Sequence, residues 1–207
     1  QYIIALFMFL AGTNFVLSYF GFKANFAKIL KDEEFLLYIK FIVIFTSIAV
    51  VILYFNSDID HFSNFTHPFV FGKFEAAFRH GFFQVVAIVT TTGFISADYT
   101  LWSPFLVVFF FGMMFSGGSA GSTSGGVKVV RHLLLIRNGF MEFKRSLHPN
   151  AVVPVRYNTK TVSGSIVFNI LGFFILYMLS FIVGALGFAL LGLDFESAIG
   201  VAASSLG

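Results

Sequence analysis

Two short stretches contain residues whose types and spacing could do chemistry. The first, TTTGF (90–94), places three threonines before a glycine and an aromatic residue. The second, GGSAGSTSGG (117–126), is a run of ten small residues between an apolar segment and a basic one. Backbone carbonyls, hydroxyls and flexible glycines can bind ions, so each stretch is compatible with several kinds of site.

The stretch 90–94, here called the filter turn, follows a short apolar segment that begins near Phe74. Threonines in series are poor helix formers and Gly93 can adopt positive φ, so a helix should end here and the backbone should become extended. Freed carbonyls near the middle of a membrane suit a desolvated cation, as does the negative end of the helix dipole. The alternative is a threonine-rich helix end that packs on its neighbours. The predicted ion-binding residues are Thr90, Thr91, Thr92, Gly93 and Phe94.

The run 117–126 matches two catalytic motifs only superficially. A phosphate-binding loop requires lysine where Val127 follows Gly126. The G-x-S-x-G motif around Ser119 requires a preceding strand, whereas a helix-length Phe/Met run precedes it here. We therefore expect neither a nucleotide site nor a serine nucleophile, and we predict that the protein is not an enzyme.

Two structural interpretations of this run remain. Gly117, Gly121 and Gly125 are four residues apart, which is the spacing of a helix-packing motif. Against it, ten such residues cost about 7 kcal/mol in a helix relative to alanine. The other interpretation is an intramembrane loop that breaks a pore-lining helix and gates it. The predicted gating loop consists of Gly117, Gly118, Ser119, Ala120, Gly121, Ser122, Thr123, Ser124, Gly125 and Gly126.

Two basic residues follow this loop, Lys128 and Arg131. We expect them to hold its cytoplasmic edge, although ordinary positive-inside anchoring explains them equally well. Seven of the thirteen Lys and Arg residues lie within 128–160, which predicts that this segment is cytoplasmic. The loop 21–34 carries three lysines and is predicted to lie on the same side.

The composition excludes a soluble domain. Hydrophobic residues make up 57% of the 207 residues, charged residues only 11%, and the mean hydropathy is +0.89. The chain has no cysteine, and its histidines (His61, His67, His80, His132, His148) show no metal-ligand spacing, so we expect no cofactor. It begins inside an apolar stretch, from which we expect it to be part of a longer protein.

Long and short apolar segments alternate along the chain. The long ones are 1–20, 35–55, 101–115 and 161–193, and the short ones are 74–94 and 194–207. A segment too short to cross about 30 Å of hydrocarbon must turn back, which predicts re-entrant half-helices. Both half-helices begin alike, with FEAA and FESA, and both run into a Thr- or Ser-rich turn with glycine. We predict an all-α polytopic membrane protein of repeated helix–pore loop–helix units with one broken helix.

Several longer stretches resemble the Trk/Ktr superfamily of potassium-uptake proteins, and most of all its TrkH branch. They are FMFLAGTNF (7–15), DEEF (32–35), FQVVAIVTTTGFISADYTLW (83–102), GGSAGSTSGGVKVVRHLLL (117–135) and LDFESAIGVAASSLG (193–207). The resemblance implies four helix–pore–helix units around one pore. It divides this chain into the last helix of one unit (1–20), a cytoplasmic loop (21–34), a complete unit (35–137), a basic cytoplasmic connection (138–160) and the start of a further unit (161–207).

The resemblance also implies a function: potassium uptake across the inner (plasma) membrane. It assigns the filter turn to K⁺ coordination by backbone carbonyls and adds a second set, Ser204, Ser205, Leu206 and Gly207. It implies a homodimer in the lipid bilayer, a cytosolic nucleotide-binding regulatory subunit at 138–160, and no nucleic acid partner. Two filter strands and the last helix of the family are missing from these residues. Alternatives are an ion-coupled secondary transporter with broken helices, or a non-conducting scaffold subunit.

Overall fold

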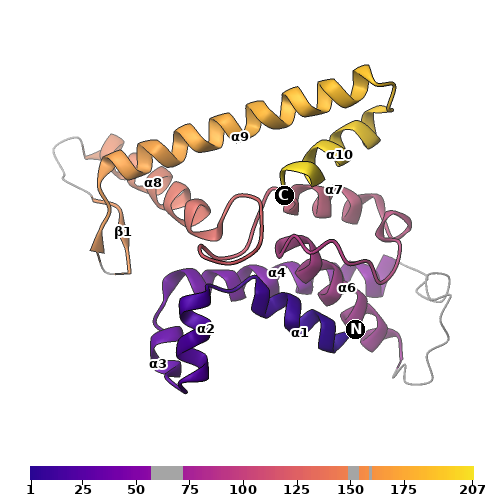
Figure 1. The fold of residues 1–207 in the computed structure, drawn as a ribbon, viewed down its shortest axis with the longest axis horizontal. Helices are drawn as coiled ribbons and strands as arrows, with labels where there is room; N and C mark the ends of the chain where they lie inside the picture. Colours follow the sequence, from indigo (N-terminus) through magenta and orange to yellow (C-terminus); the bar gives the residue numbers. More distant parts are fainter. Residues whose placement is uncertain (57–71, 149–153, 159) are drawn as a thin grey trace.

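The computed structural model describes residues 1–56, 72–148, 154–158 and 160–207 and is mainly helical (Figure 1). His61, His67 and parts of the 138–160 segment lie outside the described residues. The helices are α1 Tyr2–Ala11, α2 Phe15–Phe22, α3 Phe26–Ile29, α4 Glu33–Asn56, α6 Lys73–Val89, α7 Pro104–Met113, α8 Val129–Leu147, α9 Gly164–Leu190 and α10 Phe195–Leu206. A short 3-10 helix covers Tyr99–Leu101, and strands β1 Arg156–Tyr157 and β2 Lys160–Thr161 form an antiparallel hairpin.

Two of the described helices are long and apolar enough to cross a membrane. They comprise Glu33–Phe55 of α4, with 23 residues, and α9, with 27. At 1.5 Å per residue each spans more than the roughly 30 Å of a hydrocarbon core. Asp32 caps the start of α4, where its carboxylate accepts a hydrogen bond from the Phe35 amide at 2.9 Å. The polar start of α4 thus marks where it enters the membrane.

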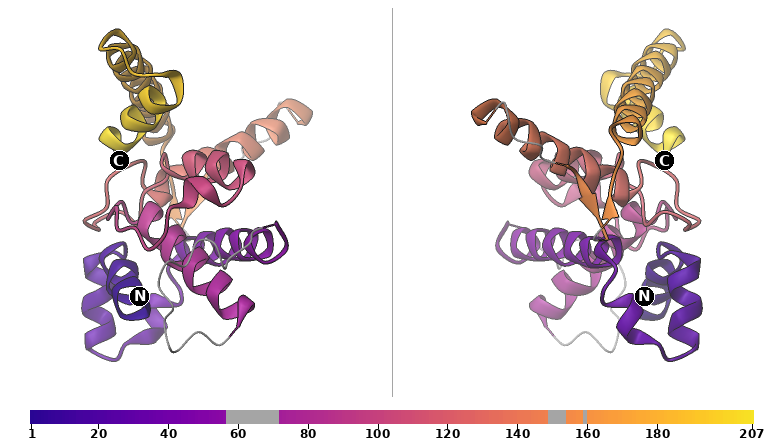
Figure 2. Two further views of the ribbon diagram at one scale, coloured as in Figure 1. Left: turned by 90° about the vertical axis from the view of Figure 1, so that its right-hand side faces the viewer. Right: turned by 90° about the vertical axis from the view of Figure 1, so that its left-hand side faces the viewer.

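Each long helix is followed by a half-helix that packs against it. Helix α6 packs on α4 and on α1, and α10 packs on α9. Gly81 of α6 faces Ala49 and Val50 of α4, and these small residues let the two helices approach closely. Figure 2 shows α9 and α10 on the opposite side of the molecule from α1, α2 and α3. The predicted fold of repeated units with re-entrant half-helices is confirmed.

The uncharged stretch 1–20 differs from the single helix expected there. It forms α1 and α2, which are bent by 116° relative to each other. Polar residues at the junction end one helix and start the next. The Thr13 hydroxyl donates to the Leu10 carbonyl at 2.6 Å, and the Asn14 side chain accepts from the Val16 amide at 2.8 Å. Hydropathy alone could not reveal this bend, because both arms are equally apolar.

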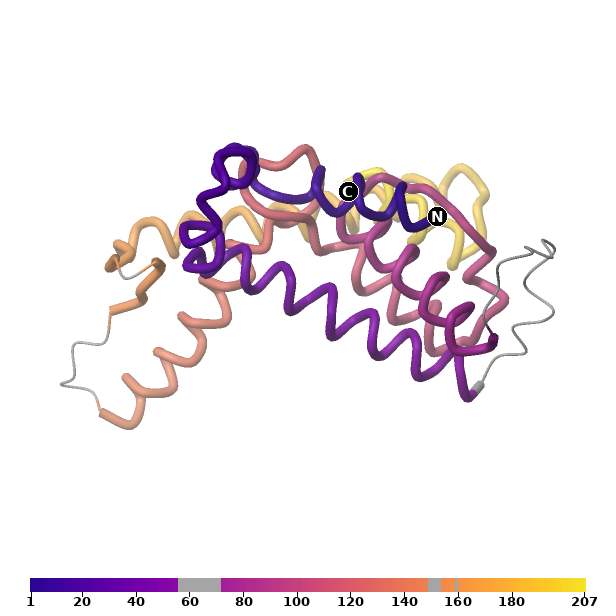
Figure 3. The backbone as a smooth tube through the Cα atoms, turned by 90° about the horizontal axis from the view of Figure 1, so that it is seen from below, coloured from indigo at the N-terminus to yellow at the C-terminus, as the bar shows by residue number. Residues whose placement is uncertain are grey.

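The run 117–126 is not helical, so the helix-packing interpretation is wrong. Helix α7 ends at Met113 and α8 begins at Val129, and between them the chain forms an open loop that returns on itself. The Gly117 amide donates to the Val127 carbonyl at 2.9 Å across the neck of this loop. The predicted broken helix is therefore present, and Figure 3 shows its loop beside the α1–α2 junction.

Candidate ion-conduction site

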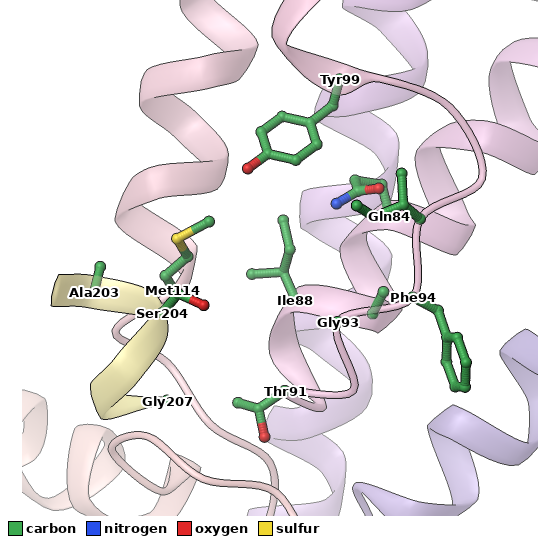
Figure 4. A pocket seen from close by; sticks show the side chains of 12 residues that line it. Gln84, Ile88, Thr91, Gly93, Phe94, Tyr99, Met114, Ala203, Ser204 and Gly207 are labelled. Atoms are coloured by element: carbon green, nitrogen blue, oxygen red, sulfur yellow. The ribbon is translucent and has the colours of Figure 1, made fainter. Parts of the chain in front are cut away.

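One pocket of about 220 Å³ brings the two predicted ion-binding segments together (Figure 4). The filter turn contributes Thr91, Gly93 and Phe94, and the end of α10 contributes Ser204 and Gly207. These segments are more than a hundred residues apart in the sequence. The remaining lining residues are Gln84, Ala87, Ile88, Ile95, Tyr99, Met114 and Ala203.

The filter turn departs from helical geometry where the threonines begin. Helix α6 ends at Val89, and Thr90 caps it, with its hydroxyl donating to the Val86 carbonyl at 2.7 Å. Thr91 has φ +53° and Gly93 has φ +69°. The first is uncommon for a β-branched residue, so surrounding contacts must hold it. The chain therefore leaves the helix sharply and enters the pocket.

The carbonyl groups of the filter turn are free to act as ligands. Within the described part of the chain, the carbonyl oxygens of residues 90–94 accept no hydrogen bond. The threonine side chains are occupied otherwise: Thr92, for example, donates its hydroxyl to Met8 Sδ at 2.9 Å. Backbone carbonyls at membrane depth need a partner, and water or a cation in the pocket can supply it.

The second predicted segment differs from the first in conformation. Ser204, Ser205 and Leu206 are the last residues of α10 and are helical, and only Gly207 lies beyond the helix. The Ser205 hydroxyl donates back to the Val201 carbonyl at 2.6 Å. Ser205 and Leu206 do not line the pocket, so of this set the structure brings Ser204 and Gly207 to it.

The gating loop touches both segments. The Gly125 amide donates to Thr91 Oγ1 at 2.7 Å, which joins the loop to the filter turn. Gly125 also lies against the Gly207 carbonyl so closely that a side chain at this position would find no room. The loop therefore contacts Thr91 and Gly207, which line the pocket, although residues 117–126 are not among the lining residues of this pocket.

The loop is held by hydrogen bonds within itself and to the α1–α2 junction. Internally, the Gly118 amide donates to Ser124 Oγ at 2.8 Å, and the Ser122 hydroxyl donates to the Ser119 carbonyl at 2.6 Å. Externally, the Ser119 amide donates to the Gly12 carbonyl at 2.9 Å. The backbone groups left free by the bend thus pair with those of the loop.

The Thr123 hydroxyl donates to the Ala11 carbonyl at 3.2 Å, and the Phe15 amide donates to the Gly121 carbonyl at 3.2 Å. Ala120 and Gly126 complete the loop, and Gly126 has φ +66°. These contacts tie the middle of the loop to both helices of the bent pair.

The two basic residues after the loop have different contacts. Lys128 Nζ donates to the carbonyl oxygens of Ser122, at 3.4 Å, and Ser124, and so holds the end of the loop. Burial lowers the pKa of the Lys128 ammonium, and the negative charge of Glu34 opposes this shift. The Arg131 guanidinium instead lies 3.7 Å from the centre of the Phe173 ring of α9. Lys128 contacts the loop directly, and Arg131 joins α8 to α9.

Besides the α1–α2 junction, sequence reasoning missed the contact of Glu34 with the loop. Glu34 lies in the DEEF stretch, is only 3% exposed, and its carboxylate accepts a hydrogen bond from the Ala120 amide. Tyr157 of the hairpin donates to the same carboxylate at 3.4 Å. Burial raises the pKa of the Tyr157 hydroxyl, and the nearby carboxylates raise it further. The available signal was an acidic residue at the start of a long apolar helix, which is an expensive place for a charge.

Comparisons with known proteins identify the family of this chain. A family model described as "TrkH: Cation transport protein" matches residues 1–205. The chain belongs to the TrkH family. The potassium uptake protein TrkH of Salmonella typhimurium is 33% identical over 205 residues, which are 99% of this chain and 40% of that protein. The TrkH of Vibrio parahaemolyticus is 34% identical over 207 residues, with the same coverage.

A solved structure shares the fold. The crystal structure of the potassium transporter TrkH from Vibrio parahaemolyticus matches with a TM-score of 0.81 and 33% identity, over 98% of this chain and 42% of that one. This TrkH-family chain is therefore an α-helical, multi-pass inner-membrane protein. It spans about 40% of the length of the curated relatives.

Proposed function

We propose that this chain forms part of the pore of a potassium-uptake protein. The observation that carries the proposal is the meeting of the filter turn and the end of α10 at one pocket, with the gating loop in contact with both. The relatives named above are potassium uptake proteins, which supports K⁺ as the transported ion. The carbonyl oxygens of residues 90–94 and those at the end of α10 would replace water around the ion.

The half-helices add electrostatic support. Both α6 and α10 have their C-terminal ends at the pocket. The C-terminus of a helix carries about half a negative charge, so two such ends favour a cation between them. Catalysis and a bound cofactor have no part in this proposal: K⁺ is the transported ion.

The gating loop supplies the means of control. In the described structure it is tied to Thr91 on one side and to Lys128 on the other. We infer that K⁺ passes when the loop moves away from the pocket and that the closed state is the one observed. Small residues suit this role because they let the loop approach the Gly207 backbone.

Contacts between the polar segments support the proposed topology. The Asn158 side chain donates to Asp32 Oδ2 at 2.9 Å, and Arg137 forms an ion pair with Glu33 at 2.6 Å. The segments 21–34 and 128–160 therefore lie together, which agrees with one cytoplasmic side. A cytosolic nucleotide-binding regulatory subunit would bind at 138–160, and exposed Phe143 on α8 supports such a contact. We further propose a homodimer as the assembly.

Uptake by the full-length protein tests the proposal. Expressed in cells that lack other K⁺ uptake systems, it should restore growth at low external K⁺ and accumulate K⁺ in preference to Na⁺. Gly93→Ser should lower that preference, since serine does not readily adopt φ +69°. Gly112→Ser is the matched control, because Gly112 has open space around it and lies in α7. Absence of K⁺ uptake would overturn the function, and an unchanged ion preference in Gly93→Ser would overturn the filter assignment.

A further inference from the structure

A buried carboxylate meets the gating loop at its middle. Glu34 is the second residue of α4, is 3% exposed, and accepts a hydrogen bond from the Ala120 amide, 86 residues further along the chain. A buried carboxylate needs hydrogen-bond donors. The hydrogen bond of a backbone amide to a carboxylate is stronger than its hydrogen bond to a neutral acceptor. Ala120 lies between Ser119, which pairs with Gly12, and Gly121, which pairs with Phe15. Glu34 thus supports the part of the loop that faces the bent helix pair.

The start of α4 is itself held by the β1–β2 hairpin. The Glu33 amide donates to Asn158 Oδ1 at 3.0 Å, and the Asn158 amide donates back to Glu33 Oε2 at 3.2 Å. Arg137 of α8 donates both to Glu33 Oε2 and to the Arg156 carbonyl, each at 2.6 Å. Tyr157 places its hydroxyl 3.4 Å from Glu34 Oε2. The hairpin therefore clamps the helix end that carries Glu34.

These contacts form a continuous path to the ion-binding segment. It runs from the hairpin to Glu34, from Glu34 to Ala120 in the loop, and from Gly125 in the same loop to Thr91. Contacts of this kind can bias a two-state element when one state keeps them and the other breaks them.

We propose that Glu34 is a positioning residue of the gate, which holds the gating loop against Thr91 and Gly207 and is itself held by Tyr157 directly and by Asn158 through the neighbouring Glu33. This inference rests on the proposed function. Glu34 is not among the residues that line the pocket. It would therefore change how often the path is open and would not change the coordination of the ion. A partner that displaced the hairpin would release the loop through the same contacts.

Substitutions at Glu34 in the full-length protein test the proposal. Glu34→Leu fills similar space but leaves the Ala120 amide without its acceptor, and should raise the maximal rate of K⁺ uptake roughly tenfold, the lower end for a hydrogen bond to a charged group. The KM for K⁺ and the preference over Na⁺ should not change. Glu34→Gln retains an acceptor oxygen and should stay within about twofold of the parent protein. Tyr157→Phe should give a smaller rise, since its contact is long.

A second measurement does not depend on transport. These 207 residues contain no cysteine. In a full-length protein whose cysteines elsewhere are replaced by serine, Ala120→Cys supplies a single thiol in the loop. Its labelling by a water-soluble thiol reagent should be faster in the Glu34→Leu background than in the Glu34→Gln background. Faster labelling without K⁺ uptake by the parent protein would overturn the proposed function and keep the positioning role. Equal labelling, or a Glu34→Leu uptake rate that is unchanged or lower at normal membrane levels, would overturn the positioning role.

Discussion

At the scale of single residues, Gly12 shows how little space surrounds the filter turn. Its φ of −77° is ordinary, so conformation does not require glycine there. The limited space around it does require glycine. A methyl group on Gly12 would lie 2.7 Å from Thr90 Cγ2 and would also collide with the Tyr38 hydroxyl. Gly12 therefore lets α1 approach the end of α6.

We predict that Gly12→Ala lowers the stability of the full-length protein by about 1–3 kcal/mol, as overpacking of a tight core does. It should also weaken K⁺ preference, because Thr90 must move. The checks are the melting temperature in detergent and the ratio of K⁺ to Na⁺ uptake. Gly139→Ala, in open space on α8, is the control and should be neutral or slightly stabilising. An unchanged melting temperature in Gly12→Ala would contradict the crowding described.

The conformation of the filter turn could be predicted from the sequence, whereas the contact of Glu34 with the gating loop could not. The turn at 90–94 follows from local chemistry, since β-branched residues and glycine end a helix wherever they occur. The contact of Glu34 with Ala120 joins positions 86 residues apart, and nothing local in either stretch encodes it. A buried acid could be suspected, but its partner follows only from the packing of α4 against α8.

At the scale of elements, helix propensity predicted that the gating loop is not helical but could not predict where the loop lies. Ten small residues make a helix costly, and the chain is indeed open from 117 to 126. The position of the loop depends on the α1–α2 junction, whose backbone groups form hydrogen bonds with it. Because both halves of 1–20 are apolar, the sequence predicts one helix there, and the junction that the loop contacts could not be predicted.

Lys128 fixes the end of this loop, which yields a prediction. Lys128→Met keeps the length of the side chain but removes the donor to the Ser122 and Ser124 carbonyls. We expect K⁺ uptake to rise roughly tenfold without a change in ion preference, since a charged hydrogen bond contributes roughly 1.5–3 kcal/mol. The measurement is the maximal uptake rate at equal membrane levels.

Lys144→Met is the matched control for Lys128→Met. It removes the same charge from exposed Lys144 in the last turn of α8 and should leave uptake unchanged. A similar rise in both variants would show that the effect comes from the net charge of this face and not from the loop.

At the scale of the whole molecule, two repeated units meet at one point. Thr91 follows the capped end of the first half-helix and Gly207 follows the second, and a Cβ on Gly207 would lie 3.7 Å from Thr91 Cγ2. Sequence repetition predicted two similar units, but the meeting of their ends is a property of the assembled chain.

We predict that a Thr91→Cys/Gly207→Cys pair forms a disulfide on mild oxidation of membranes, because a Cβ at position 207 would touch the Thr91 side chain and a disulfide joins only neighbouring side chains. Peptide mass spectrometry of the full-length protein detects the bond. These 207 residues contain no cysteine, and any cysteine elsewhere in the full-length protein is first replaced by serine to remove competing pairs. Thr91→Cys with Ser197→Cys is the control, since position 197 lies about 15 Å further along α10. Equal yields from both pairs would refute the convergence of the two units.

The bend between α1 and α2 has a consequence for biosynthesis. The Ala11 carbonyl at the bend is paired with Thr123, 112 positions later in the chain. At usual rates of synthesis the ribosome needs about 5 to 20 seconds to make that length. During this interval the polar backbone of the bend requires water, since hydrocarbon offers it no hydrogen bond. The Ala11 carbonyl therefore gains its hydrogen bond only after the gating loop has been synthesised, so the packing of the α1–α2 junction depends on a segment made much later.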